Sequence, residues 1–408
     1  MDNEKKFSLE RIKKITILII IINIIEFISL ILLIIFYLTK KKSKNKILND
    51  EWNDIYGIRI IEIPYYSNNK ILNSFKIKGE NYDEVIGNIN NGKDYSKTDR
   101  NYYNIYIPYS SLKNKEKANG IILFIHGGWW KMGNKEDISL YCSRYAKLGY
   151  ITATMGYTLL NEKYKKKSNI FRIIDEITAC IHNIKEYLKN LGFNVDKLEL
   201  AIGGYSAGGH LTLLYGYKIK NSPIPIKFLI NIVGPITLEP EYWYKVTNNN
   251  TLNSILPDDI ENALNNNLLV EVFSDHYELL KYMNIFLGKK YSDDYLQKMI
   301  VNQKIDKNNQ NFKSLFKIIQ KAYPTYYIDK NSLPTICVYG GNDQVVGFAH
   351  YSSLKKLYDL YGVINKLIYM RYGEHDINDY NTEDGIKALK EMNYQILQFT
   401  YDYFNQES

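Results

Sequence analysis

The stretch LELAIGGYSAGGH, residues 198–210, constrains the fold more than any other part of the chain. An apolar run at residues 198–202 leads directly into a turn with four glycines, and Ser206 lies at the centre of a G-x-S-x-G pattern there. Where a strand reverses sharply into a helix, the apical residue is strained, and the residues two positions away have to be small. The pentapeptide alone also suits an ordinary turn, but the apolar run before it and the helix-like residues after it predict a nucleophile elbow. Ser206 is then expected at the N-terminus of a helix that begins near Ala207.

Short apolar runs alternate with helix-like segments from residue 102 to residue 404. Repeated strand–helix–strand units are typical of a parallel sheet covered by helices on both faces. We therefore predict an α/β fold, a three-layer sandwich with a mostly parallel central sheet. Residues 237–330 break this rhythm, and we expect them to form a cap insertion over the site, with a solvent-side elaboration as the alternative. Strands are expected at residues 102–109, 120–125, 150–157, 198–202, 226–233, 333–339 and 366–371, and helices at 170–191, 350–361 and 385–403.

A second glycine motif follows the buried strand predicted at residues 120–125. It reads His126-Gly127-Gly128-Trp129-Trp130. Acyl transfer needs N–H donors for the oxyanion that forms, and a glycine pair after a strand lets a backbone loop come close enough to supply them. The motif is therefore a candidate oxyanion loop, although a glycine pair also suits a plain strand-ending turn.

Asp343 and His375 each follow a predicted strand, in the chain order Ser206, Asp343, His375. Catalytic groups of open parallel sheets collect at the carboxyl ends of the strands. A histidine can take the proton of a serine hydroxyl, and a carboxylate can orient the imidazole and stabilise its charged form. Taken singly, the aspartate suits a turn and the histidine suits a polar loop, but together with Ser206 they predict a catalytic triad.

Four other residues compete for these roles. His126 and His210 are weaker candidates for the base, because the first lies inside the glycine motif and the second one turn past the elbow. Glu374 and Asp376 adjoin His375 and could replace Asp343 as its partner. We favour Asp343, because a residue next to the histidine in sequence readily points elsewhere.

The N-terminal region differs from the rest in composition. Residues 1–14 are basic, residues 15–38 are almost unbroken in isoleucine, leucine and phenylalanine, and residues 39–101 suggest a tether followed by irregular or edge-strand structure. Residues 15–38 are long enough as a helix to cross a bilayer, and they lack the short apolar region and cleavage site of a signal peptide. The sequence therefore predicts a single-pass membrane anchor. Basic residues flank it on both sides, so its orientation is left open.

Charge and cysteine content argue against a nucleic-acid-binding protein and against a cysteine-based metal site. Residues 1–50 carry ten basic and five acidic residues, so they contribute +5 of the net charge of +8, and the remainder gives no nucleic-acid footprint. The three cysteines, Cys142, Cys180 and Cys337, show no metal-ligand spacing and suit buried apolar positions. We expect no cofactor and no metal.

These motifs resemble the α/β-hydrolase fold, and specifically the esterase branch near hormone-sensitive lipase. The resemblance rests on the HGG-x-W loop and on the segments GYSAGGH, PTICVYGGNDQVV and YGEHD, and it covers residues 102–404. Within this branch, the HGG-x-W form is similar to the acetyl-xylan and feruloyl esterase-like group, to kynurenine formamidases and to prenylcysteine methylesterases. The resemblance implies the roles of the following residues: the nucleophile Ser206, its triad partners Asp343 and His375, and the oxyanion-hole donors Gly127, Gly128 or Trp129 together with Ala207.

Two departures from the branch are visible. Trp129 stands where relatives of hormone-sensitive lipase carry a third glycine, which implies a narrower acyl pocket. A strand that usually ends in a tyrosine–arginine pair here reads Gly156-Tyr157-Thr158. The sequence thus predicts a membrane-anchored serine hydrolase that cleaves a small-molecule carboxylic ester through an acyl-enzyme. The alternatives are cleavage of an amide or formamide by the same triad, and a catalytically idle small-molecule binding protein.

Overall fold

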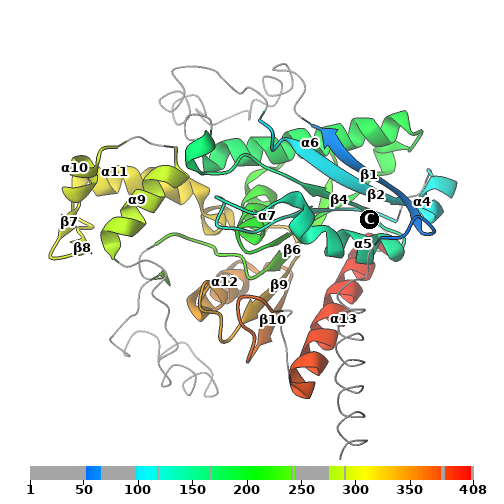
Figure 1. Ribbon diagram of the computed structural model, residues 1–408. Helices are drawn as coiled ribbons and strands as arrows, with labels where there is room; N and C mark the ends of the chain where they lie inside the picture. Colours follow the sequence, from blue (N-terminus) through cyan, green and yellow to red (C-terminus); the bar gives the residue numbers. More distant parts are fainter. Residues whose placement is uncertain are drawn as a thin grey trace, which may run out of the picture. The chain divides into compact units, whose positions relative to one another are not determined.

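An eight-stranded sheet forms the centre of the molecule, in the strand order β1-β2-β4-β3-β5-β6-β9-β10 (Figure 1). The computed structural model describes residues 52–65, 98–116, 119–164, 168–239, 242–243, 275–288, 291–377 and 382–405. Residues from Trp52 onward form one compact unit. The strands are β1 (Gly57–Pro64), β2 (Tyr102–Pro108), β3 (Ile121–Ile125), β4 (Ile151–Met155), β5 (Leu200–Tyr205), β6 (Ile226–Ile232), β9 (Thr335–Gly340) and β10 (Asn365–Met370).

The sheet is mostly parallel, as predicted. β1 pairs with β2 and β2 with β4 in antiparallel fashion, and all other neighbours are parallel. Every residue of β3, β4 and β9 is buried, because helices cover both faces of these strands. β1 alternates between buried or half-buried and exposed residues, which is typical of an edge strand. The predicted fold class, an α/β-hydrolase sandwich with a mostly parallel sheet, is confirmed.

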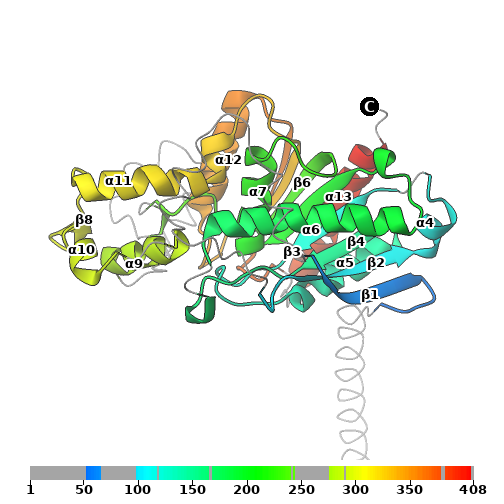
Figure 2. The same cartoon turned by 90° about the horizontal axis from the view of Figure 1, so that it is seen from above.

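Two helical layers cover the sheet (Figure 2). One core contains residues of α6 (Ile170–Asn190), α7 (Ala207–Lys218) and α12 (Phe348–Tyr361). The other contains residues of α5 (Ser139–Lys147) and α13 (Glu383–Asn405). α7 is buried almost along its whole length, so the helix that follows the elbow lies in the interior of the protein. The short elements α4 (Tyr109–Lys113), η1 (Lys135–Ile138), η2 (Glu162–Tyr164) and η3 (Val195–Lys197) connect these parts.

A largely helical segment is inserted between β6 and β9. Its helices α9, α10 and α11 lie together beside the sheet in both views (Figures 1 and 2). Residues of α9 and α11 belong to the same apolar core as α6 and α7, so the insertion packs against the helical layer of the sheet. The elements are α9 (His276–Phe286), α10 (Asp293–Gln297), β7 (Ile300–Val301), β8 (Lys304–Ile305), α11 (Gln310–Ile319), η5 (Gln320–Ala322) and η6 (Pro324–Tyr327).

The predicted localisation requires a correction. Across the described part of the chain, no helix is both long and apolar enough to cross a membrane. The two longest helices there, α6 and α13, have sufficient length but carry charged residues along it, which a single span does not tolerate. This finding contradicts the prediction of a single-pass membrane protein. The predicted span, residues 15–38, lies outside the described residues.

Candidate active site

Ser206 lies at a sharp turn between β5 and α7. Its backbone is strained, with φ of 53° and ψ of −119°. Glycine is required on both sides of it, because a Cβ at Gly204 would lie 2.1 Å from the carbonyl oxygen of Gly208, and a Cβ at Gly208 would lie 2.0 Å from that of Ile125. The N–H of Ser206 donates to the carbonyl of Ile232 on the neighbouring strand β6, at 2.8 Å. The turn is therefore held by close packing against β3 and by a hydrogen bond to β6.

Three side chains from distant parts of the chain form a continuous hydrogen-bonded line. His375 Nε2 lies 3.0 Å from Ser206 Oγ, and His375 Nδ1 lies 2.9 Å from Asp343 Oδ2. Because a carboxylate only accepts, Nδ1 carries the imidazole proton, and Nε2 is then the acceptor for the serine hydroxyl. Ser206 follows β5, Asp343 follows β9 and His375 follows β10, so all three lie at the carboxyl edge of the sheet.

The surroundings fix the orientation of Asp343 and His375. The second oxygen of Asp343, Oδ1, accepts the N–H groups of Val345 and Val346 at 2.7 and 2.8 Å. The Asp343 side chain is fully buried, whereas that of His375 is 23% exposed. The hydroxyl of Tyr205, next to Ser206, donates to the carbonyl of His375. Asp343 thus holds the imidazole at Nδ1 and Tyr205 holds the backbone of His375, while the side chain of His375 remains partly exposed.

The loop formed by residues 126–130, called the 126–130 loop below, packs directly against the elbow. A Cβ at Gly127 would lie 2.9 Å from the carbonyl oxygen of Tyr205 and 3.1 Å from Cβ of Ser206. Three successive residues then have positive φ: Gly128 at 101°, Trp129 at 53° and Trp130 at 57°. Positive φ costs a non-glycine residue about 1 to 3 kcal/mol, so the surroundings must hold the two tryptophans in place.

The carbonyl groups of the loop have partners that turn them toward the protein. The hydroxyl of Tyr157 lies 3.2 Å from the carbonyl oxygen of His126 and 3.3 Å from that of Gly127, and its ring stacks on the His126 imidazole at 4.2 Å. The carbonyl of Gly128 accepts two N–H groups of the following turn at 2.9 and 3.0 Å. Because a carbonyl and the next N–H share one rigid plane and point in opposite directions, these contacts set the direction of the N–H groups of Gly128 and Trp129.

A small pocket lies at Ser206. It is lined by aromatic and aliphatic side chains, and its free space of about 10 Å³ holds roughly one water molecule. The lining residues are Trp129, Trp130, Ser206, Ala207, Pro235, Trp243, Val345 and Val346.

The competing candidates lie elsewhere or have other partners. His126 Nδ1 donates to the carbonyl of Gly127, and burial lowers the pKa of His126 to about 3. His210 Nε2 donates to the carbonyl of Ala322, and burial lowers its pKa to about 4. Glu374 and Asp376 are exposed. The three cysteines are buried, and no cluster of histidine, cysteine or acidic side chains within the described ranges could hold a metal ion.

A family model described as BD-FAE matches residues 104–358, more than half of the chain. The chain belongs to the BD-FAE family. This is a family of esterases with the α/β-hydrolase fold, so the predicted kinship and the predicted enzyme class, a carboxylic ester hydrolase, are confirmed.

Solved structures share the fold of this BD-FAE protein at low sequence identity. A truncated carbohydrate esterase from gut microbiota is 14% identical, with a TM-score of 0.53 over 85% of this chain and 98% of that one. Esterase B from Lactobacillus rhamnosis (HN001) is 15% identical, with a TM-score of 0.54 over 91% and 93%. The non-reducing polyketide synthase atr1 of Stereocaulon alpinum is 26% identical over 127 residues, which are 31% of this chain and 5% of that protein. This chain thus spans only a small part of the polyketide synthases that it matches.

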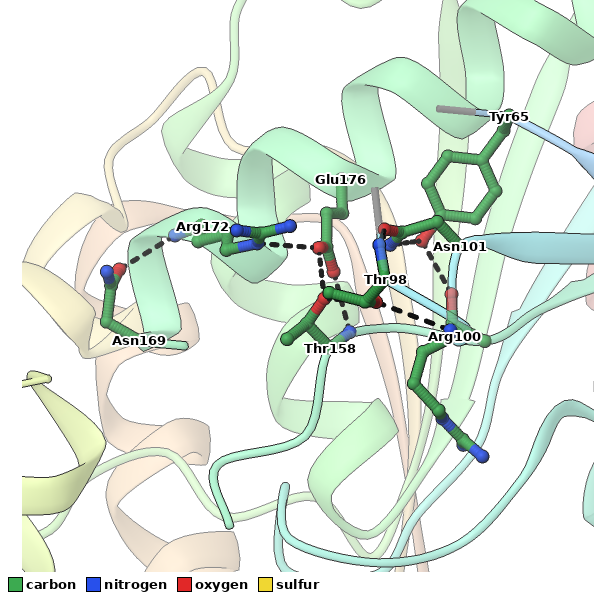
Figure 3. A network of polar contacts seen from close by, with 9 residues as sticks. Tyr65, Thr98, Arg100, Asn101, Thr158, Asn169, Arg172 and Glu176 are labelled. Atoms are coloured by element: carbon green, nitrogen blue, oxygen red, sulfur yellow. Dashed lines mark hydrogen bonds and ion pairs between the residues drawn. The ribbon is translucent and has the colours of Figure 1, made fainter. Parts of the chain in front are cut away.

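The BD-FAE protein also contains a buried carboxylate that the sequence analysis missed, shown in Figure 3. Glu176 on α6 accepts the N–H of Thr158 at 2.7 Å, the hydroxyl of the same threonine, and Nε of Arg172 at 2.9 Å. The Arg172 and Glu176 side chains are 2% and 0% exposed. Thr158 is the residue that replaces the expected arginine after Tyr157, and Arg172 now supplies a guanidinium from α6 itself. The spacing of Arg172 and Glu176, four residues on a predicted helix, was the available sequence signal.

The network continues toward the N-terminal side of the domain (Figure 3). The Thr158 hydroxyl lies 3.0 Å from that of Thr98, which also contacts Asn101 Oδ1 at 3.1 Å. Asn101 Nδ2 donates to the Tyr65 hydroxyl, which in turn donates to the carbonyl of Gly156 at 2.6 Å. These contacts fasten the end of β4 on both sides of Tyr157, so they support the residue that holds the 126–130 loop.

Proposed function

We propose that this BD-FAE protein is a serine esterase in which Ser206 is the nucleophile, His375 the general base and Asp343 the residue that orients it. The observation that carries the proposal is the line from Ser206 Oγ to His375 Nε2 and from His375 Nδ1 to Asp343, with both distances within hydrogen-bonding range. The base is partly exposed and its carboxylate is fully buried, which suits a group that exchanges a proton with a bound ligand.

The reaction begins when Ser206 Oγ attacks the ester carbonyl carbon and its proton passes to His375 Nε2. Asp343 stabilises the imidazolium that results. The negative carbonyl oxygen is stabilised by N–H groups of the 126–130 loop, from among Gly127, Gly128 and Trp129, and by that of Ala207 at the start of α7. In the collapse of this intermediate, the alcohol leaves with the proton from His375, and the acyl group remains on Ser206.

The second half of the reaction repeats these steps with water. His375 takes a proton from water, the hydroxide attacks the acyl-enzyme, and the carboxylic acid leaves as Ser206 regains its proton. The pocket at Ser206, with Trp129 and Trp243 among its walls, supports a substrate with a small acyl group. The substrate is therefore a small-molecule carboxylic ester.

Replacement of Ser206 by alanine tests the proposal. Turnover of p-nitrophenyl acetate by Ser206→Ala should fall by at least about 10⁴-fold, because no other group can form the acyl-enzyme. A fluorophosphonate probe should label the wild-type protein but not the variant. Wild-type turnover in Ser206→Ala would overturn the assignment, and a wild-type protein that neither turns over esters nor reacts with the probe would be an idle binding protein.

A further inference from the structure

Helix α9 of the inserted segment reaches the 126–130 loop. The hydroxyl of Tyr282 donates to the carbonyl oxygen of Trp129 at 2.7 Å, although the two residues are 153 positions apart in the chain. Tyr282 is only 6% exposed, so water competes little for this bond. The ring of Tyr282 meets that of Trp129 edge-on, with centroids 6.2 Å apart, and the ammonium of Lys131 lies 4.3 Å from its centroid. Tyr282 thus holds both the backbone and the side chain of Trp129.

The peptide plane that Tyr282 contacts lies at the strained point of the loop. It joins Trp129 and Trp130, the two non-glycine residues with positive φ. The two N–H groups that donate to the carbonyl of Gly128 belong to the two residues directly after the tryptophans, so their position depends on the conformation of both tryptophans. Release of the Trp129 carbonyl would let the two residues relax and would shift the turn that follows them. The Gly128–Trp129 peptide plane, which carries the N–H of Trp129, would then lose the contacts that set its direction.

The same helix contacts the second source of oxyanion donors. Phe286, one turn after Tyr282, packs against Trp130 with ring centroids 5.0 Å apart, and against His210 at 5.8 Å. His210 belongs to α7, the helix that begins at Ala207. One face of α9 therefore touches both elements whose N–H groups are proposed to bind the oxyanion.

We propose that Tyr282 is a positioning residue for the oxyanion hole, acting through the carbonyl of Trp129. The inserted segment then takes part in fixing the reacting geometry. This inference rests on the proposed function, because an oxyanion hole has a role only if Ser206 forms a tetrahedral intermediate.

The test compares an oxoester with its thionoester in the Tyr282→Phe variant of the full chain. The variant keeps the ring and loses only the hydroxyl. The sulfur of p-nitrophenyl thionoacetate is larger than oxygen and accepts hydrogen bonds poorly, so its turnover depends less on the oxyanion donors. We expect kcat on p-nitrophenyl acetate to fall roughly tenfold with little change in KM, because the donors lose alignment, while turnover of the thionoester changes less than about twofold.

Tyr103→Phe is the matched control. Tyr103 is also a buried tyrosine, and its hydroxyl donates to Asn183 Oδ1 at 3.1 Å. It lies on β2, which β4 separates from β3, the strand that leads into the 126–130 loop. Its variant should retain wild-type turnover of both esters. An equal fall on both esters in Tyr282→Phe, or no fall on either, would overturn the positioning role. Ser206→Ala, measured alongside, separates the proposed function from the inference about Tyr282. An inactive Ser206→Ala variant together with an unaltered Tyr282→Phe variant would contradict only the inference about Tyr282.

Discussion

Asp343 and Glu176 are both buried carboxylates, but they lie in two different regions. The region around Asp343 is open to solvent through its partner, and the region around Glu176 is closed to solvent. Both side chains are completely inaccessible to solvent, and both accept hydrogen bonds on each oxygen. The partner of Asp343 is His375, which is 23% exposed and reaches Ser206. The partner of Glu176 is Arg172, which is 2% exposed. Burial alone therefore does not distinguish Asp343, for which we propose a role in catalysis, from Glu176; the accessibility of the partner differs between them.

The physical reason lies in what each partner can do. An arginine keeps its proton at all relevant pH values, so the pair of Glu176 and Arg172 can only stabilise the fold. A neutral histidine with one nitrogen held by a carboxylate presents the other to a ligand and can accept a proton there. Replacement of Asp343 by its amide should therefore affect mainly activity, and replacement of Glu176 by its amide should affect mainly stability.

The largest effect is expected from Asp343→Asn. An asparagine can still accept the N–H groups of Val345 and Val346. It offers Nδ1 of His375 no charged acceptor, however, so the proton is not held on that nitrogen, and kcat for p-nitrophenyl acetate should fall about 10⁴-fold. The free energy of unfolding, measured by urea denaturation, should change far less than activity does. Near-normal turnover in this variant would remove Asp343 from the proposed triad.

The second effect concerns stability. Glu176→Gln leaves Arg172 as a buried charge without a carboxylate and should lower the free energy of unfolding by about 3 to 5 kcal/mol. Below the unfolding temperature, kcat should stay within about threefold of wild type, since a glutamine can still accept the N–H of Thr158 and so keep the support of Tyr157 and the 126–130 loop. Glu186→Gln, a partly exposed position on the same helix, is the control and should cost less than about 0.5 kcal/mol. A large loss of kcat in Glu176→Gln without a loss of stability would erase the contrast between the two regions.

The smallest expected effect is a pH dependence of stability, and it comes from a buried histidine. Unlike His375, His350 is fully buried; its Nδ1 accepts the N–H of Ile236 at 3.1 Å, and burial lowers its pKa to about 3. The unfolded chain binds a proton there near an ordinary pKa of about 6.5. The unfolded state thus holds more protons between these values, so the free energy of unfolding falls as the pH decreases from about 6.5, by about 1.4 kcal/mol per pH unit for each such histidine.

His350→Asn isolates this contribution, because asparagine can still accept the N–H of Ile236 but does not titrate. Urea denaturation of the wild type at pH 7 and pH 5 should show a fall in stability that exceeds the fall in the variant by roughly 2 kcal/mol. Equal falls in the two proteins would mean that His350 is not kept neutral by its burial.

Much of the sheet and of the candidate site could be predicted because their signals are local. Seven predicted strands correspond to β2, β3, β4, β5, β6, β9 and β10, and the helices predicted at residues 170–191, 350–361 and 385–403 correspond to α6, α12 and α13. Ser206, Asp343 and His375 stand directly after such strands, and a parallel sheet brings its carboxyl ends to one edge. β1 was expected only as an irregular or edge-strand region, because the stretch around it is polar and rich in asparagine, glycine and aspartate.

Other features arise from contacts between residues far apart in the chain. The hydroxyl of Tyr282 meets Trp129 only because α9 packs beside the 126–130 loop, and Glu176 meets Thr158 only because α6 crosses the end of β4. Neither contact leaves a pattern in the nearby sequence. The prediction of a membrane protein is not supported within the described residues, because the two longest helices there, α6 and α13, carry charged residues.

The sequence by itself indicated which segments form strands, where the chain turns at Ser206 and which residue types are available for proton transfer, because glycine spacing and apolar periodicity act over a few residues. The tertiary structure favours Asp343 over the neighbours Glu374 and Asp376 as the partner of His375, since Asp343 is buried with Oδ2 at 2.9 Å from Nδ1, whereas Glu374 and Asp376 are exposed. It also decided how the carbonyl groups of the 126–130 loop are oriented, because their partners come from Tyr157 just after β4, from the turn that follows the loop and from the inserted helix α9.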